Sequence, residues 1–141
     1  MEDINILWVD DEIDLLKPHF LFLKDRGYES TPCTNGQDAL DLIRNHSFDI
    51  VLLDENMPGL NGLETLTEIK KIKTELPVVM ITKNEEEHIM NEAIGRKIVD
   101  YLIKPVNPNQ ILIALKKIFN KKNIISEKIS QDYQKQFSLI S

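Results

Sequence analysis

Short apolar runs alternate along this chain with segments of helical periodicity, and this alternation limits the folds available to it. Each apolar run is followed by a segment whose apolar residues recur three or four positions apart, which is typical of an amphipathic helix. Repeated strand–helix units of this kind form a parallel sheet with helices on its faces. The predicted strands are Ile4–Val9, Glu29–Thr34, Ile50–Leu53, Val78–Ile81 and Val99–Ile103.

The predicted helices complete five strand–helix units. They are expected at Asp14–Arg26, Gln37–Asn45, Leu63–Lys73, Glu86–Gly95 and from Asn107 onward. Pro32 interrupts the second strand and places it at or near an edge of the sheet. The pattern predicts an α/β, doubly wound, flavodoxin-like (βα)5 fold with a five-stranded parallel sheet, whose ligand site lies beyond the carboxyl ends of the strands.

The segment 121–141 follows the fifth unit. Its apolar residues Ile125, Ile129, Tyr133 and Phe137 are four positions apart, which predicts a C-terminal helical extension. This helix is either a linker or the start of a following domain, or a dimer helix, or it packs back on the same domain. We therefore expect a domain over residues 4–120 and a separate helical segment after it.

Charge and cysteine content exclude several classes of protein. The net charge of −6 argues against direct binding of nucleic acid by this chain. Cys33 is the only cysteine, so an internal disulfide and a cysteine-based zinc cluster are excluded. The start of the sequence is acidic and its first apolar run is too short for a signal peptide or membrane span, so we expect a cytoplasmic protein without a membrane partner.

Polar residues stand at the carboxyl ends of the predicted strands. Asp10 and Asp11 follow the first strand, Asp54 the third, Thr82 the fourth and Lys104 the fifth. Parallel strands end at the same edge of a sheet, so these side chains should converge. Three close carboxylates repel one another, and a hard divalent cation such as Mg²⁺ relieves that repulsion. A nearby lysine suits a phosphate, which indicates a phosphoryl-transfer site.

Asp54 is the best candidate for the reacting carboxylate. It follows the apolar run Ile50–Leu53 of a central strand, and a rigid position suits a nucleophile that attacks in line. A cation beside it would neutralise the charge that opposes attack by one anion on another.

These residues resemble a known family. Asp10-Asp11, Asp54 within DENMPGLNG, Thr82, Tyr101 and Lys104-Pro105 are similar to the CheY-like receiver domain of two-component response regulators, over about residues 4–120. The resemblance implies that Asp54 accepts a phosphoryl group from a sensor histidine kinase. It also implies a signalling switch whose chemistry is limited to its own phosphorylation and dephosphorylation, not an enzyme.

The resemblance further implies a ligand set for Mg²⁺, with Mn²⁺ as an alternative. Asp11 and Asp54 would bind the cation through side-chain oxygens, Asn56 through its backbone carbonyl, and Asp10 mostly through water. These roles come from the family and not from the spacing of the residues.

The same resemblance implies a switch. Lys104, in a cis Lys104-Pro105 bond, would pair with a phosphoryl oxygen. Thr82 would move to hydrogen-bond another oxygen, and Tyr101 would turn inward. The readout surface would be the face of the fourth helix, fifth strand and fifth helix, which would control homodimerisation or an output module.

A narrower resemblance concerns four stretches, ILWVDDEIDLLKPH, DENMPGLNGLETL, MITKNEEEHIM and YLIKPVNPNQIL. They are similar to the PorX-like regulators of Bacteroidetes type IX secretion. In that group a receiver precedes a helical segment and a PglZ-type, alkaline-phosphatase-superfamily domain. The resemblance implies that the output module lies outside this chain or belongs to a partner.

Two residues depart from the usual receiver pattern. Glu55 and Lys83 stand where receivers more often carry an apolar and a small residue. Both border the predicted phosphoryl site, so they affect donor access and phosphate lifetime.

Three other functions fit the sequence less well. A haloacid-dehalogenase-like aspartyl phosphatase needs an acid two residues after its nucleophile, where this chain has Asn56. A flavodoxin-type carrier needs a phosphate loop after the first strand, where two carboxylates stand instead. A DNA-binding regulator needs more residues than the 121–141 segment offers for a helix-turn-helix domain.

Overall fold

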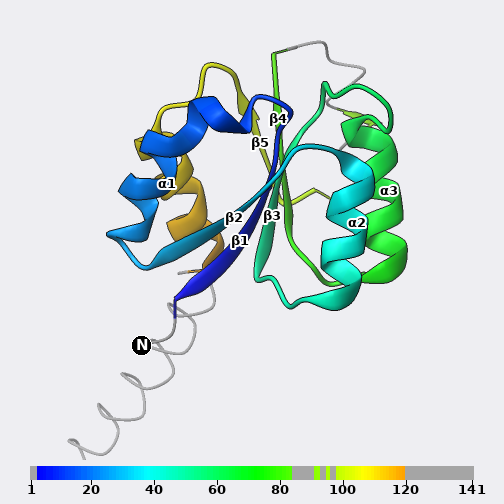
Figure 1. Cartoon of the computed structure of the whole chain (residues 1–141), viewed down its shortest axis with the longest axis horizontal. Coiled ribbons are helices and arrows are strands. Elements are labelled where there is room, and N and C mark those ends of the chain that lie inside the picture. The colour runs from blue at the N-terminus through cyan, green and yellow to red at the C-terminus, as the bar shows by residue number, and fades with distance from the viewer. Residues whose placement is uncertain (1–2, 84–90, 93–94, 96–97, 120–141) are drawn as a thin grey trace, which may run out of the picture. The chain divides into compact units, whose positions relative to one another are not determined.

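The computed structural model describes residues 3–83, 91–92, 95 and 98–119. Its strands form one parallel sheet in the order β2-β1-β3-β4-β5, which confirms the doubly wound α/β fold. The strands are β1 (Ile4–Val9), β2 (Tyr28–Cys33), β3 (Ile50–Asp54), β4 (Val78–Thr82) and β5 (Asp100–Ile103). Helix α1 lies on one side of the sheet and helices α2 and α3 on the other (Figure 1).

Burial follows the position of each strand in the sheet. β3 and β4 are buried along their whole length, as expected for strands that have a neighbour on each side. β2 pairs only with β1, so Pro32 does lie in an edge strand. The registers set Val9 beside Leu53 and Leu53 beside Met80, so β3 extends one residue beyond the end of β1, and β4 one residue beyond the end of β3.

The first helix begins later than the sequence pattern predicted. Ile13–Leu16 form a short 3₁₀ helix, η1, and α1 spans Lys17–Lys24, with Pro18 in its first turn. The predicted α-helix from Asp14 was wrong because the Pro18 ring lacks an N–H and clashes with a carbonyl one turn earlier. The helix ends before Gly27, whose φ of 88° needs a residue without a side chain.

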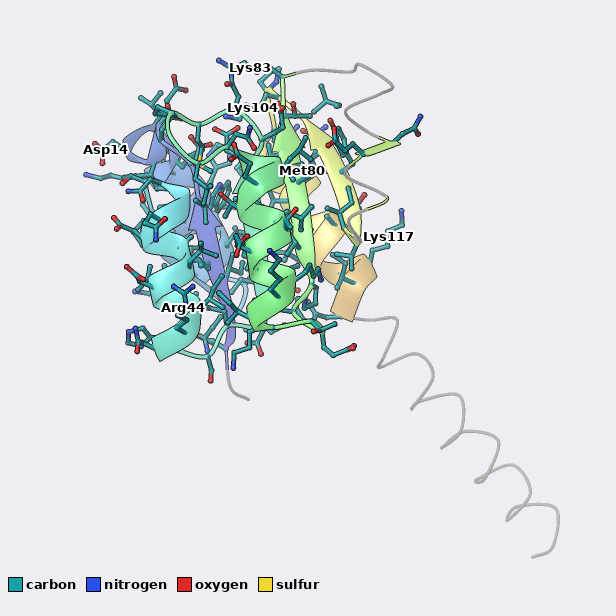
Figure 2. The ribbon with its side chains drawn as sticks, turned by 90° about the vertical axis from the view of Figure 1, so that its right-hand side faces the viewer. Asp14, Arg44, Met80, Lys83, Lys104 and Lys117 are labelled. Atoms are coloured by element: carbon teal, nitrogen blue, oxygen red, sulfur yellow. The ribbon has the colours of Figure 1, made fainter. Side chains whose placement is uncertain are left out.

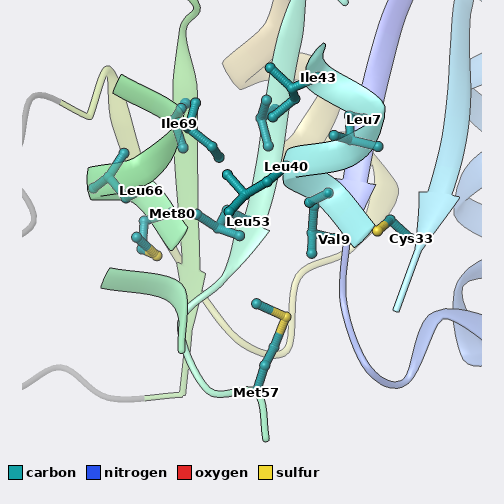
Figure 3. Close-up of a cluster of buried hydrophobic side chains, with 13 residues drawn as sticks. Leu7, Val9, Cys33, Leu40, Ile43, Leu53, Met57, Leu66, Ile69 and Met80 are labelled. Carbon is teal, nitrogen blue, oxygen red and sulfur yellow. The ribbon is translucent and has the colours of Figure 1, made fainter. Parts of the chain in front are cut away.

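The side of the sheet toward α2 and α3 carries the largest cluster of buried side chains. Helix α2 spans Gly36–Asn45 and α3 spans Gly62–Ile72. The alternation of side chains along a strand sends Leu7, Val9 and Leu53 to this side (Figure 3). Trp8 points to the other side, where its ring meets those of His19 and Phe20 in α1.

Two of the predicted helical segments are described only in part. Residue contacts divide the chain into units over 1–108 and 109–141. Residues 108–119 are helical, as predicted, and Ile111 and Leu115 on that helix are buried. Most of the predicted helix at 86–95, and the whole segment 121–141, lie outside the described residues. None of the described helices has the length and apolar character needed to cross a membrane.

Candidate functional site

Three carboxylates meet at the carboxyl edge of the sheet. Asp10 follows β1, Asp54 ends the adjacent β3, and Asp11 stands beside Asp10. One oxygen of each lies within 4.8 Å of the others. Asp10 and Asp54 are 3% and 2% exposed, whereas Asp11 faces solvent. Carboxylate oxygens at this spacing suit a hard divalent cation that keeps several waters, so these residues fit Mg²⁺.

Lys104 joins the two buried carboxylates. Its Nζ lies 3.2 Å from Asp10 Oδ2 and 3.3 Å from Asp54 Oδ2. Its backbone N–H donates to the Thr82 carbonyl at 2.7 Å, which ties the end of β5 to the end of β4. Burial alone would lower the pKa of Lys104, but the two carboxylates outweigh it and raise that pKa. The ammonium therefore remains charged and ready to pair with an anion.

Asp54 stands in an unfavourable place for a negative charge. Burial, followed by the charge of Asp10, raises the pKa of Asp54 to about 6. Lys104 and a 3.2 Å hydrogen bond from the Asn56 backbone N–H to Asp54 Oδ1 oppose this rise without cancelling it. A bound cation, or a change that makes the carboxylate neutral, would reduce the free-energy cost of the negative charge on Asp54.

The loop after β3 is fixed at several points, and this sets the backbone around the site. Met57 is 5% exposed and belongs to the buried cluster, so it anchors the loop beside Asn56 (Figure 3). Asn61 and Glu64 form a reciprocal capping box at the start of α3. A side chain on Gly62 would lie 2.5 Å from the Glu55 Cα, so only glycine allows this close approach.

A cleft of about 500 Å³ opens over this site. Lys83 and Lys104 both line it and lie together at this end of the sheet (Figure 2). Its other lining residues are Asp11, Glu12, Asp54, Asn56, Met57 and Pro58. The cleft thus combines the Asp54 carboxylate with two ammonium groups that could pair with an anionic ligand. Lys83, which stands where receivers more often carry a small residue, adds positive charge here.

Thr82 does not line this cleft. Its side chain is 0% exposed, and its hydroxyl donates to Glu55 Oε2 at 3.0 Å. Tyr101, on β5, shares a side-chain hydrogen bond with Thr82. Burial raises the pKa of Tyr101, and the charge of Glu55 adds to the rise while the bond to Thr82 opposes it. Thr82, Tyr101 and Glu55 therefore form one group next to the cleft.

The structure brings together most of the residues that the sequence singled out. Asp10, Asp11, Asp54 and Lys104 converge as predicted, and the Lys104-Pro105 bond is cis. The contact from Glu55 to Thr82 was missed. The pairing of Asp54 with Ile81 makes Glu55 and Thr82 neighbours, but their contact depends on side-chain rotamers, which the sequence pattern does not indicate.

The doubly wound sheet and the carboxylate–lysine site at its carboxyl edge define an α/β protein of the CheY-like class. The sequence profile of the response regulator receiver domain matches residues 6–116, so the chain belongs to the response regulator receiver family. It is a signalling switch domain of two-component systems. Receiver domains take phosphoryl groups from sensor histidine kinases and typically bind Mg²⁺.

Individual relatives agree with this assignment. The chain is 30% identical over 139 residues to the transcriptional regulatory protein ZraR of Klebsiella oxytoca, covering 99% of this chain and 31% of ZraR. It is 30% identical over 117 residues to the response regulator SaeR of Staphylococcus aureus strain USA300, covering 83% of this chain and 51% of SaeR. The match thus spans somewhat less than a third of the length of ZraR and about half the length of SaeR.

Solved structures show the same fold. The CheY-like receiver domain protein from Methanospirillum hungatei JF-1 superposes with a TM-score of 0.80 at 25% identity. The match covers 86% of this chain and 98% of that protein.

Proposed function

We propose that Asp54 is the phosphoacceptor of this receiver domain and that a sensor histidine kinase supplies its phosphoryl group. The observation that carries this proposal is the position of Lys104, whose Nζ lies within 3.3 Å of both Asp10 and Asp54 in an open cleft. An ammonium in that place neutralises a phosphoryl oxygen on Asp54 as readily as it neutralises the carboxylates.

The transfer is a displacement at phosphorus. A carboxylate oxygen of Asp54 forms a bond to the phosphorus as the phosphorus–nitrogen bond of the kinase phosphohistidine breaks. The imidazole leaves with the electron pair and takes up a proton. The products are an aspartyl phosphate and a neutral histidine. Asp54 is already buried at the end of a central strand, so it needs little reorganisation to attack in line.

Mg²⁺ or Mn²⁺ fits the carboxylates beside this position. Asp11 and Asp54 would hold the cation directly, Asn56 would add its backbone carbonyl, and Asp10 would act mostly through water. When bound, the cation supplies charge neutralisation for the transferring phosphoryl group.

The switch in this proposal runs through the group beside the cleft. Thr82 moves its hydroxyl to the phosphoryl group, and Tyr101 follows it inward. The altered face of the fourth helix, β5 and the fifth helix then controls homodimerisation or an output module in the cytoplasm. The proposal of a role in type IX secretion, with the output domain supplied outside residues 4–120, rests on the four sequence stretches that resemble PorX-like regulators.

The first test is chemical. Incubation with acetyl phosphate and Mg²⁺ should place an acid-labile, hydroxylamine-sensitive phosphate on Asp54, identified by mass spectrometry after borohydride trapping. Omitting the cation should abolish the product. A phosphate that resists hydroxylamine, or one mapped to another residue, would refute the assignment.

The second test is binding of beryllofluoride, which stands in for the phosphoryl group. The single tryptophan, Trp8, lies two residues before Asp10 and provides a fluorescence signal. Wild type with Mg²⁺ should bind beryllofluoride, and Asp54→Asn should not. Asp41→Asn makes the same chemical change on exposed α2 and should bind like wild type. Equal binding by Asp54→Asn and wild type would contradict the proposal.

A further inference from the structure

The hydroxyl of Thr82 is already engaged by a charged acceptor. It donates to Glu55 Oε2 at 3.0 Å, across two strands whose residues are 27 positions apart in sequence. Thr82 is fully buried, and a buried hydroxyl that gives up its acceptor must find another one. The carboxylate of Glu55 therefore determines where the Thr82 proton points in the unphosphorylated chain.

The backbone of Glu55 gives this contact a fixed base. The Glu55 N–H donates to the Ile81 carbonyl at 2.8 Å, which extends the β3–β4 ladder by one residue. The Glu55 carbonyl accepts from the Gly62 N–H at 2.9 Å, and Gly62 packs tightly against the Glu55 backbone. Because hydrogen bonds hold the Glu55 main chain on both sides, the Glu55 carboxylate moves away from Thr82 by rotation of the Glu55 side chain.

Tyr101 belongs to the same group. It shares a side-chain hydrogen bond with Thr82, and the charge of Glu55 acts on its hydroxyl. The Tyr101 side chain also packs against the buried cluster beneath α2 and α3. If the Thr82 hydroxyl changes its hydrogen-bond partner, its hydrogen bond with Tyr101 on β5 is therefore affected as well.

The chemistry makes Glu55 and a phosphoryl group competitors. A threonine hydroxyl has one proton to donate, and it cannot serve two anionic acceptors at once. A phosphoryl group on Asp54, the residue before Glu55, would also repel the Glu55 carboxylate, because like charges in a poorly solvated site oppose each other.

We propose that Glu55 is a positioning residue that holds Thr82 away from the cleft, so that phosphorylation must displace the Glu55 carboxylate before the switch is completed. This inference rests on the proposed function of Asp54 and adds a holding contact to it. A ligand can shift such an equilibrium only by its differential affinity for the two arrangements. Glu55 therefore weakens the apparent affinity of any phosphoryl group that needs Thr82.

Two variants separate the charge of Glu55 from its hydrogen bond. Glu55→Leu removes both, and Glu55→Gln keeps an acceptor for Thr82 without the charge. With Mg²⁺ present, we expect Glu55→Leu to bind beryllofluoride about tenfold more tightly than wild type. In wild type the hydrogen bond from Thr82 to the charged Glu55 must be broken when the ligand binds, and the variant does not have that cost. Glu55→Gln should fall between the two. Glu68→Leu removes a carboxylate from the α3 surface and should leave the affinity unchanged.

Coupling to Thr82 tests whether the effect uses the proposed contact. In a Thr82→Ala background, Glu55→Leu should raise the beryllofluoride affinity clearly less than it does in wild type, because the competed hydroxyl is gone and only the charge repulsion from Glu55 remains. Urea unfolding of each variant confirms that it is folded before binding is measured.

The outcomes distinguish this inference from the function on which it rests. Tighter binding by Glu55→Leu that is clearly reduced in the Thr82→Ala background supports the holding contact. Unchanged or weaker binding by Glu55→Leu overturns it, as does an equal gain with and without Thr82. Loss of selectivity for Asp54, seen as binding by Asp54→Asn, would instead overturn the proposed phosphoacceptor.

Discussion

Asp54 is 2% exposed and lies in a buried trio with Asp10 and Lys104. When both carboxylates are ionised the trio carries one uncompensated negative charge. Burial, followed by the charge of Asp10, raises the pKa of Asp54 to about 6. The pKa of an aspartate in the unfolded chain is about 3.9, so between these values the folded protein binds the proton more tightly. Stability therefore falls as pH rises through this window, and the full penalty applies above it.

Asp54→Asn should remove that penalty. Without divalent cations and at neutral pH, we expect the variant to be more stable than wild type by about 2 to 3 kcal/mol, the free energy that corresponds to the pKa shift. The difference should shrink as pH falls from about 6 to about 4 and vanish below that, where Asp54 is protonated in both states. Urea unfolding in the presence of a chelator, repeated across this pH range, measures it.

Asp41→Asn serves as the control for this measurement. Asp41 is exposed and pairs with Arg44 on the surface of α2, so the same substitution there should change stability by less than about 1 kcal/mol. A stability difference for Asp54→Asn that did not depend on pH would show that burial and charge are not its cause.

At the scale of elements, the join between β3 and α3 shapes the site. The N-terminus of α3 is set by the Asn61–Glu64 capping box, and Gly62 brings the helix against the Asp54 carbonyl and the Glu55 Cα. The loop between them carries Asn56 and is anchored in the core by Met57. The position of one helix end therefore determines the backbone on which the metal and phosphoryl ligands are held.

Gly62→Ala tests this connection. The added methyl would lie 2.5 Å from the Glu55 Cα and 2.6 Å from the Asp54 carbonyl oxygen, so backbone must shift. We expect a loss of about 1 to 3 kcal/mol in unfolding free energy, as for other overpacked sites, together with weaker Mg²⁺ binding by Trp8 fluorescence. Gly95→Ala meets nothing within 4 Å and should leave Mg²⁺ binding unchanged. Unaltered Mg²⁺ binding in Gly62→Ala would contradict the connection.

Sequence periodicity located these elements well but not their first turns. The strand cores and the buried faces of α2 and α3 were predictable, because a two- or three-to-four-residue repeat directly reflects burial. The start of α1 was not predicted, since Pro18 blocks hydrogen bonding one turn back and η1 takes up the preceding residues.

At the scale of the whole molecule, parallel strands explain why the site could be found from the sequence. Asp10, Asp54 and Lys104 are far apart along the chain, yet their strands all end at one edge of the sheet. The Glu55–Thr82 contact was beyond such reasoning because it depends on a side-chain rotamer and not on strand direction. The boundary predicted at residue 120 stays a prediction, because residues 120–141 lie outside the described part.

Cation binding should be visible in the stability of the whole domain. A ligand that binds only the folded state adds about 2.7 kcal/mol at a hundredfold excess over its dissociation constant, so the unfolding midpoint of wild type should rise steadily with MgCl₂. NaCl at matched ionic strength should give a much smaller rise. Asp54→Asn should gain less from MgCl₂ than wild type, and equal gains would argue that the cation binds elsewhere.

Pro32 lies in the edge strand β2 and has no backbone N–H, so this strand has one hydrogen-bond donor fewer. The unpaired backbone N–H and C=O groups of an edge strand can pair with a strand of another molecule, and many folded proteins begin to aggregate in this way. A proline in that row breaks the continuous ladder that such growth requires. Sheet-to-sheet polymerisation through β2 is thus discouraged by a single residue, which leaves other surfaces free to bring two copies together under control.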